Sequence, residues 1–153
     1  MAGGLEIRAG RAEEQDWCAR LMACSEPWIT LGQELELCRQ KVARPGTELF
    51  VTEGGAGREL AGFILLVPHG FAGSPYINSI AVASEARGRG VGAALLRFAE
   101  EHFAGRGQIF LLVSSFNSRA QKFYRREGYE YIGELKDYIV PGHSELIFGK
   151  RLA

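Results

Sequence analysis

The chain has 153 residues, of which 46% are apolar and 24% are charged, with 18 Lys and Arg against 18 Asp and Glu. These values exclude a disordered chain and fit one globular domain that can bury its own core. Because the formal net charge is zero, no global field attracts nucleic acid or an anionic membrane.

The cysteines and the N-terminus indicate a reduced compartment. Cys18, Cys24 and Cys38 cannot all pair with one another, and none lies in a CxxC motif, so we expect free thiols and no metal site. The N-terminus lacks the apolar segment of a signal peptide, and the longest apolar run, residues 60–67, is too short to span a membrane. A cytoplasmic protein without a membrane partner is expected.

The N-terminal third is predicted to form a strand followed by two helices. Residues 5–8 alternate as a short strand does, and the first helix, which Pro27 ends, has an apolar face of Trp17, Leu21 and Cys24. A capping box of Thr30 with Gln33 starts the second helix, whose apolar stripe is Leu31, Leu35, Cys38 and Val42.

Three strands are predicted next. Residues 48–52 and 60–67 form a hairpin across the glycine-rich residues 53–58. After a loop at residues 68–75, the third of these strands takes residues 76–82.

Helices and strands alternate in the C-terminal half. A long helix follows the glycine-rich segment 87–92, and residues 109–113 are apolar throughout, as in a strand covered on both faces. A capping box of Ser118 with Gln121 opens a short helix that Gly128 closes.

Residues 129–135 and 145–149 complete the chain as an antiparallel hairpin. The order β-α-α-β-β-β-α-β-α-β-β predicts an α/β (α+β) fold, with a mixed central sheet flanked by helices in a single domain over residues 1–153.

The segment 87–92, Arg-Gly-Arg-Gly-Val-Gly, is a candidate anion site. Its glycines allow backbone N–H groups to converge, and the N-terminus of the following helix adds partial positive charge. Arg87 and Arg89 supply charge that a pyrophosphate would attract. The alternative is that this segment is only a tight turn between a strand and a helix, with both arginines exposed to solvent.

Two nucleotide-binding patterns fit this segment poorly. A Walker loop needs Lys-Ser/Thr after its last glycine, where this chain has Ala93-Ala94. Gly88-x-Gly90-x-x-Ala93 matches the loose dinucleotide pattern, but the next strand ends in residues 113–116, Val-Ser-Ser-Phe, without the ribose-binding carboxylate. A nucleotide-dependent oxidoreductase is therefore disfavoured.

A third pattern combines Arg87-x-x-Gly90-x-Gly92 with a second segment in the next helix, Asn117-x-x-Ala120-x-x-Phe123-Tyr124-x-x-x-Gly128-Tyr129. In this order, each at the start of a helix that follows a strand, the two segments resemble the GNAT superfamily of N-acetyltransferases. The resemblance implies an acetyl-CoA-dependent acyltransferase. It also implies that strands 76–82 and 109–113 splay apart around the pantetheine arm of acetyl-CoA.

The resemblance further implies site residues. Tyr124 corresponds to the usual general acid of the family, a phenol that is neutral at working pH and can protonate the leaving thiolate; the alternative is a tyrosine of the core. Asn117 would bind the cofactor arm or, equally, cap a helix. The other cofactor-binding residues would be Ile80, Ala81, Val82, Arg87, Gly88, Arg89, Gly90, Val91, Gly92 and Ala93.

The general base stays open, because strand 76–82 has no Asp or Glu. The remaining candidates lie on flanking segments where surface positions are expected: His69, His143 and Glu145. In this family the acceptor site is formed by the loop between the first two helices and the last hairpin, which points to Trp28 and Tyr138. Asn78, on strand 76–82, is a further candidate for the acceptor site.

The expected partners are acetyl-CoA and an amine acceptor, with no metal and no nucleic acid. Homodimers are common in the family, so a homodimer is an option. A non-catalytic acyl-CoA-binding module is the main alternative to an enzyme, because of the missing carboxylate.

Overall fold

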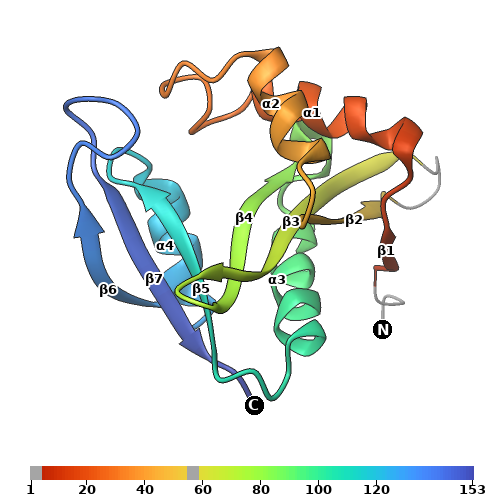
Figure 1. The fold of residues 1–153 in the computed structure, drawn as a ribbon. Helices are drawn as coiled ribbons and strands as arrows, with labels where there is room; N and C mark the ends of the chain where they lie inside the picture. Colours follow the sequence, from red (N-terminus) through yellow and green to blue (C-terminus); the bar gives the residue numbers. More distant parts are fainter. Residues whose placement is uncertain (1–4, 55–58) are drawn as a thin grey trace.

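The computed structural model describes residues 5–54 and 59–153 of the chain (Figure 1). Its elements follow the predicted order, with two short 3-10 helices added: β1 (Ile7–Ala9), η1 (Ala12–Glu14), α1 (Gln15–Ala23), α2 (Leu35–Ala43), β2 (Glu48–Glu53), β3 (Leu60–Phe71), β4 (Ser74–Val82), η3 (Ser84–Ala86), α3 (Val91–His102), β5 (Gln108–Ser114), α4 (Ser118–Arg126), β6 (Glu130–Leu135) and β7 (Glu145–Arg151).

All seven strands form one mixed sheet in the order β1-β2-β3-β4-β5-β7-β6. The pair β4–β5 is parallel and the other neighbouring pairs are antiparallel. The predicted final hairpin is confirmed, since β6 pairs with β7, and β7 lies between β5 and β6. The predicted mixed α/β sheet flanked by helices is thereby confirmed.

Helices cover both faces of the sheet. On one face, Cys18 of α1 and Cys38 of α2 pack in a cluster with Phe63 of β3. On the other face, Leu95 of α3 packs in a cluster that contains Ile64, the next residue along β3. Because successive strand residues point to opposite faces, β3 contributes to both clusters and forms the centre of the core.

The sheet opens between β4 and β5. These strands pair only at Tyr76↔Phe110 and Ile77↔Leu111. On the other side of β4, the β3 partner shifts from Ser79 to Ile77 between adjacent residues, which leaves Asn78 as an extra, bulged residue. Beyond this bulge β4 and β5 diverge (Figure 1), which confirms the predicted splay.

The predicted start of the second helix is wrong. The helix begins at Leu35, because Gly32 adopts a left-handed φ of 70° and interrupts the turn before it. Thr30 instead donates to the Glu26 carboxylate from its N–H, at 3.1 Å, and from its hydroxyl, at 2.7 Å. The predicted face of α1 is also displaced: its buried side chains are Cys18, Ala19 and Met22.

The loop predicted at residues 68–75 is wrong as well. Strand β3 continues through Phe71 and β4 starts at Ser74, because Ala72 and Gly73 have φ values of 52° and 84° and close a two-residue hairpin turn. Of the predicted turn at residues 53–58, residues 55–58 lie outside the described part of the chain.

The three cysteines are free thiols. Within residues 5–54 and 59–153, no helix has the length and apolar character that crossing a bilayer requires.

The close contact between β3 and β4 gives a test of the packing. A Cβ at Gly62 would lie 2.8 Å from the carbonyl oxygen of Ala81, so backbone would have to move. We expect Gly62→Ala to lower the free energy of unfolding in urea by about 1–3 kcal/mol. Gly133→Ala is the matched control, because a Cβ there would meet nothing nearer than 3.9 Å. Equal losses of unfolding free energy in Gly62→Ala and Gly133→Ala would contradict the close contact at Gly62.

Candidate functional site

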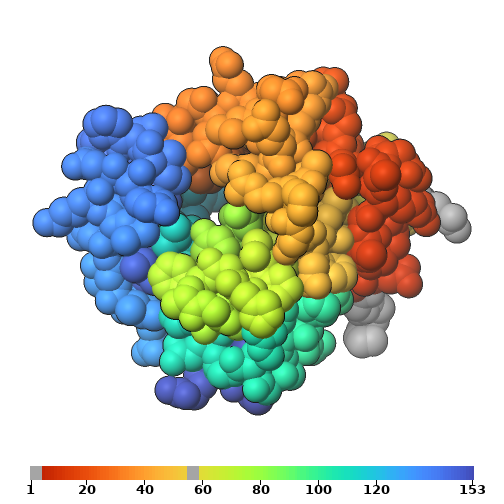
Figure 2. Space-filling model, in the orientation of Figure 1, coloured from red at the N-terminus to blue at the C-terminus, as the bar shows by residue number. Residues whose placement is uncertain are grey.

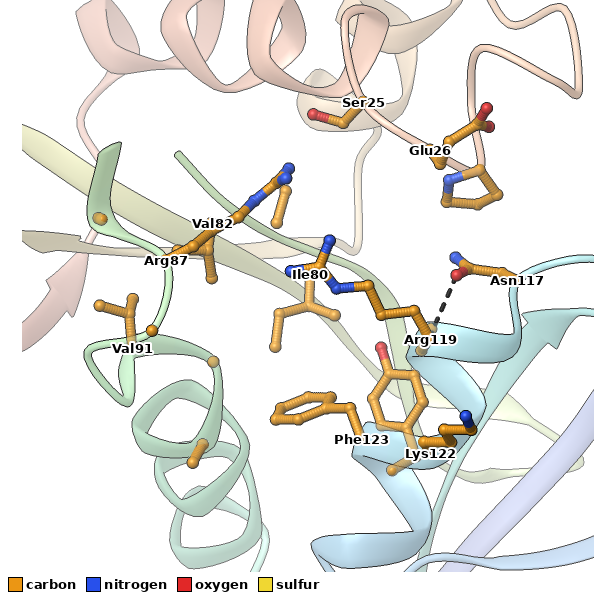
Figure 3. Close-up of a pocket in the computed structure, with 18 of the residues that line it drawn as sticks. Ser25, Glu26, Ile80, Val82, Arg87, Val91, Asn117, Arg119, Lys122 and Phe123 are labelled. Carbon is orange, nitrogen blue, oxygen red and sulfur yellow. Dashed lines mark hydrogen bonds between the residues drawn. The ribbon is translucent and has the colours of Figure 1, made fainter. Parts of the chain in front are cut away.

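A cleft of about 900 Å³ lies on the side of the sheet opening that α3 and α4 border (Figure 3). Its lining comes from four segments: the loop after α1, the end of β4, the segment from η3 into α3, and α4. These are segments that the sequence motifs singled out, apart from the loop after α1.

The glycine-rich loop gives this cleft a backbone surface that accepts an anion. Gly88 and Gly90 have φ values of 77° and 78°, and a Cβ at either would meet no atom within 4 Å. Gly90 is the N-cap of α3 and has no side chain to bond the first-turn N–H groups. The amides of Val91, Gly92 and Ala93 are therefore free to donate to a ligand at the positive end of the helix.

Basic side chains outnumber acidic ones in the lining of this cleft. Arg87 and Arg119 extend into it from opposite sides (Figure 3), while the carboxylates present are Glu26 and Glu127. The basic residues of α4 in this lining are absent from the predicted site: Arg119, Lys122 and Arg126. Their spacing of three and four residues, which places side chains on one helix face, was the available signal.

Helix α4 is held at its start by Asn117, not by the predicted Ser118–Gln121 box. The side-chain Oδ1 of Asn117 accepts from the N–H of Ala120 at 3.2 Å. The Gln121 amide instead donates to the backbone carbonyls of Ser114 and Ser115, at 3.3 and 3.0 Å. These bonds fix α4 to the end of β5.

Tyr124 of α4 lines the cleft and is 8% exposed. Its ring packs against Phe123 and Tyr129, with centroids 5.2 and 6.0 Å away. Burial raises the pKa of this phenol, so it stays a neutral hydrogen-bond donor across the physiological range. The residue is thus both packed in the core and part of the cleft lining.

A second, smaller cleft of about 120 Å³ meets the first at the opening. The space-filling view shows the hollow where the loop after α1, the β3–β4 hairpin and the β6–β7 region come together (Figure 2). The two clefts share the following lining residues: Pro27, Trp28, Ile80, Asn117, Ala120 and Tyr124.

Glu145 is the carboxylate that lines the smaller cleft. The predicted surface position of this residue is wrong: Glu145 is 4% exposed, and its Oε2 accepts a 2.8 Å hydrogen bond from the Ser114 hydroxyl. Burial raises the pKa of the carboxyl group. The signal that could have found it is its place at the start of the apolar run 146–148.

Most residues predicted for the site line one of the two clefts. Arg89 and Tyr138 line neither, and Tyr138 is 62% exposed. Asn78 lines only the smaller cleft. The remaining predicted residues line the larger one: Trp28, Ile80, Ala81, Val82, Arg87, Gly88, Gly90, Val91, Gly92, Ala93, Asn117 and Tyr124.

The other two candidate bases lie outside both linings. His69 contacts the Arg106 guanidinium and the carbonyl oxygen of Gly73. His143 packs edge-on against Phe116, with ring centroids 4.8 Å apart. Throughout the described ranges, no group of three or more His, Cys, Asp and Glu side chains is placed to hold a metal ion.

Comparisons with known proteins point to one family. The model of the acetyltransferase (GNAT) family matches residues 13–129. An uncharacterized N-acetyltransferase of Methanocaldococcus jannaschii is 35% identical over 82 residues, which make up 52% of this chain and 53% of that protein. The chain spans about half the length of the curated relatives that it matches.

Solved structures share the fold at low sequence identity. A protein of Desulfovibrio desulfuricans assigned to the GNAT family aligns with a TM-score of 0.79 and 19% identity, over 97% of this chain and 99% of that one. An aminoglycoside 6'-N-acetyltransferase complexed with coenzyme A aligns with a TM-score of 0.76 and 17% identity, over 97% of each chain.

The buried Glu145 predicts a pH-dependent change in stability. Because its folded pKa is raised, the folded chain binds this proton more tightly than the unfolded chain does. Its contribution to stability is therefore complete below the ordinary carboxyl pKa and is lost as the pH rises through the raised value. Glu145→Gln replaces the carboxyl group with an uncharged amide of the same shape as the protonated form. The melting temperature of this variant should therefore match that of the wild type at about pH 4 and exceed it at about pH 7.5.

Thermal unfolding followed by circular dichroism at both pH values measures this difference. Glu134→Gln, at an exposed position of β6, is the control and should leave the melting temperature unchanged at either pH. A Glu145→Gln protein that melts below the wild type at the higher pH would contradict the expected sign.

Proposed function

Because this chain belongs to the GNAT family of acetyltransferases, we propose that it transfers the acetyl group of acetyl-CoA to a primary amine. The observation that carries the proposal is the junction of the two clefts at Tyr124. A donor in the larger cleft and an acceptor in the smaller one would meet there without a covalent enzyme intermediate.

The residues of the larger cleft fit acetyl-CoA. The N–H groups at the start of α3 and the basic side chains around them suit its phosphates. The end of β4, from Ile80 to Val82, has no β5 partner and offers backbone groups to the pantetheine amides. Acetyl-CoA supplies the thioester that activates the acetyl group. A structural neighbour, an aminoglycoside 6'-N-acetyltransferase, was solved with coenzyme A, which supports this assignment.

Glu145 and Tyr124 divide the proton transfers between them. An amine must lose its extra proton before it can attack, and we assign the uptake of that proton to Glu145, the carboxylate of the smaller cleft. Attack forms the C–N bond and breaks the C–S bond. The departing thiolate takes a proton from the Tyr124 hydroxyl, and the phenolate regains one from the attacking nitrogen, which is positively charged after the attack and becomes the neutral amide nitrogen on losing this proton.

The direct test is a panel of primary amines incubated with acetyl-CoA and assayed by release of free thiol. Release that depends on both enzyme and amine supports the transfer reaction. If acetyl-CoA binds but no amine causes release, the chain is instead a non-catalytic acyl-CoA-binding module.

Backbone access at the glycine-rich loop should control acetyl-CoA binding. A side chain at Gly90 would enter open space that the phosphates would occupy. We expect Gly90→Val to weaken binding by about ten- to hundredfold in calorimetric titration, the effect of losing charge-assisted hydrogen bonds to backbone N–H groups.

Gly105→Val is the matched control for this substitution. Gly105 has a similar φ, 83° against 78°, and equally open surroundings, but it lines neither cleft. Both variants therefore carry similar backbone strain. Equal acetyl-CoA affinity in the two variants would overturn the assignment of the loop.

Tyr124 should act in the chemical step. Tyr124→Phe keeps the buried ring and removes only the hydroxyl, so we expect kcat to fall by about 10²–10⁴-fold, as for a lost general acid. The affinity for acetyl-CoA and the melting temperature should change little, because the hydroxyl is needed when charge develops on sulfur. Tyr131→Phe, at an exposed position of β6, is the control. Near-normal kcat in folded Tyr124→Phe protein would make Tyr124 a residue of the core only.

A further inference from the structure

The smaller cleft contains two opposite charges that do not neutralise each other. Glu145 of β7 and Lys41 of α2 both line it. Each favours the charged form of the other electrostatically, yet among the described ion pairs, which reach to 4.0 Å, none joins them. The carboxylate accepts only the Ser114 hydroxyl among the described residues, which leaves its Oε1 available.

Lys41 is a half-buried ammonium group without a protein partner. It makes no hydrogen bond or ion pair with any residue in the ranges 5–54 and 59–153, and burial lowers its pKa. Lysines of this kind on a surface helix usually reach solvent or pair with a carboxylate. Here the side chain borders the cleft, where an anionic group of a ligand would supply the missing partner.

The rest of the lining suits a compact ligand. The volume of about 120 Å³ is well below the range of roughly 300–1,000 Å³ that is typical of sites for drug-sized molecules. Trp28, Leu31 and Ile139 provide apolar walls. The Tyr76 hydroxyl has no hydrogen-bond partner among the described residues, and burial raises its pKa to about 12, so it remains a donor suited to an anionic oxygen.

These features fit a zwitterion better than a cation. A polyamine or another polycation would need several carboxylates, whereas this lining offers one, and Lys41 would repel a second ammonium group. A peptide N-terminus would place a neutral amide, rather than a carboxylate, beside Lys41.

We propose that the acceptor is a small amino acid, with its amino group directed to Glu145 and Tyr124 and its carboxylate bound by Lys41. This inference rests on the proposed acetyl transfer and names the acceptor class for the same site. Lys41 is then the residue that distinguishes an amino acid from a simple amine.

The test compares amino acids with the amines that they give on decarboxylation, such as alanine with ethylamine and leucine with 3-methylbutylamine. In thiol-release assays with acetyl-CoA, the wild type should have a kcat/KM about ten- to hundredfold higher for the amino acid of a pair, the effect of one charge-assisted contact. Lys41→Met should abolish this preference mainly by raising KM for the amino acid. Lys41→Arg, which keeps the charge, should retain part of it.

Arg44→Met, at an exposed position just beyond α2, is the matched control and should keep the wild-type preference. Transfer to simple amines with no preference for amino acids would overturn the inference and leave the acetyltransferase function intact. A preference that survives in Lys41→Met would equally overturn the role of Lys41. Absence of thiol release with every acceptor would overturn the transfer function itself, and this inference with it.

Discussion

The early end of the pairing between β4 and β5 is the constraint on which the rest of the site depends. Two paired positions hold these strands together before the bulge at Asn78 turns β4 away. In a continuous sheet, the backbone at the end of β4 would be used in ladder bonds and the two faces would be separated by a closed layer. The opening instead leaves these groups free and lets Tyr124, from the face of α3 and α4, border both clefts. One local irregularity thus leaves the end of β4 without a β5 partner and connects the two clefts.

Charge is separated over short distances in a chain whose net charge is zero. The larger cleft combines a helix N-terminus with basic side chains from α4 and from the loop before α3. The smaller cleft holds a single carboxylate and a single ammonium group, brought together from β7 and α2. Global composition therefore says little about ligands here. What matters is which elements the topology brings to the opening, where a largely basic cleft meets a smaller cleft that has one carboxylate and one ammonium group.

The sequence predicted the elements and their order well, because apolar periodicity and the glycine-rich loop are local signals. It also predicted that the loop, the end of β4 and Tyr124 belong to one site, and residues of all three line the larger cleft. Its errors concern positions where other contacts, near or distant in the chain, override the local pattern. Thr30 has the sequence of a helix start, yet the Glu26 carboxylate binds it in a turn, and Gly32 delays the helix to Leu35. A surface position is the ordinary expectation for a carboxylate such as Glu145. Its burial follows from the position of β7 between β5 and β6, of which the apolar run 146–148 is the local signal.

The placement of Glu145 and Lys41 is unfavourable for stability alone. Removing two charged groups from water carries a desolvation penalty, and direct contact between them would recover part of it. The fold keeps them in one cleft but holds them on different elements, α2 and β7, without a mutual ion pair. Apolar side chains at these positions would avoid the penalty. Polar groups that remain buried and incompletely paired are concentrated at functional sites, where a ligand completes their interactions. The unpaired charges are therefore best explained together, by one ligand that carries both complementary charges, rather than by two separate roles.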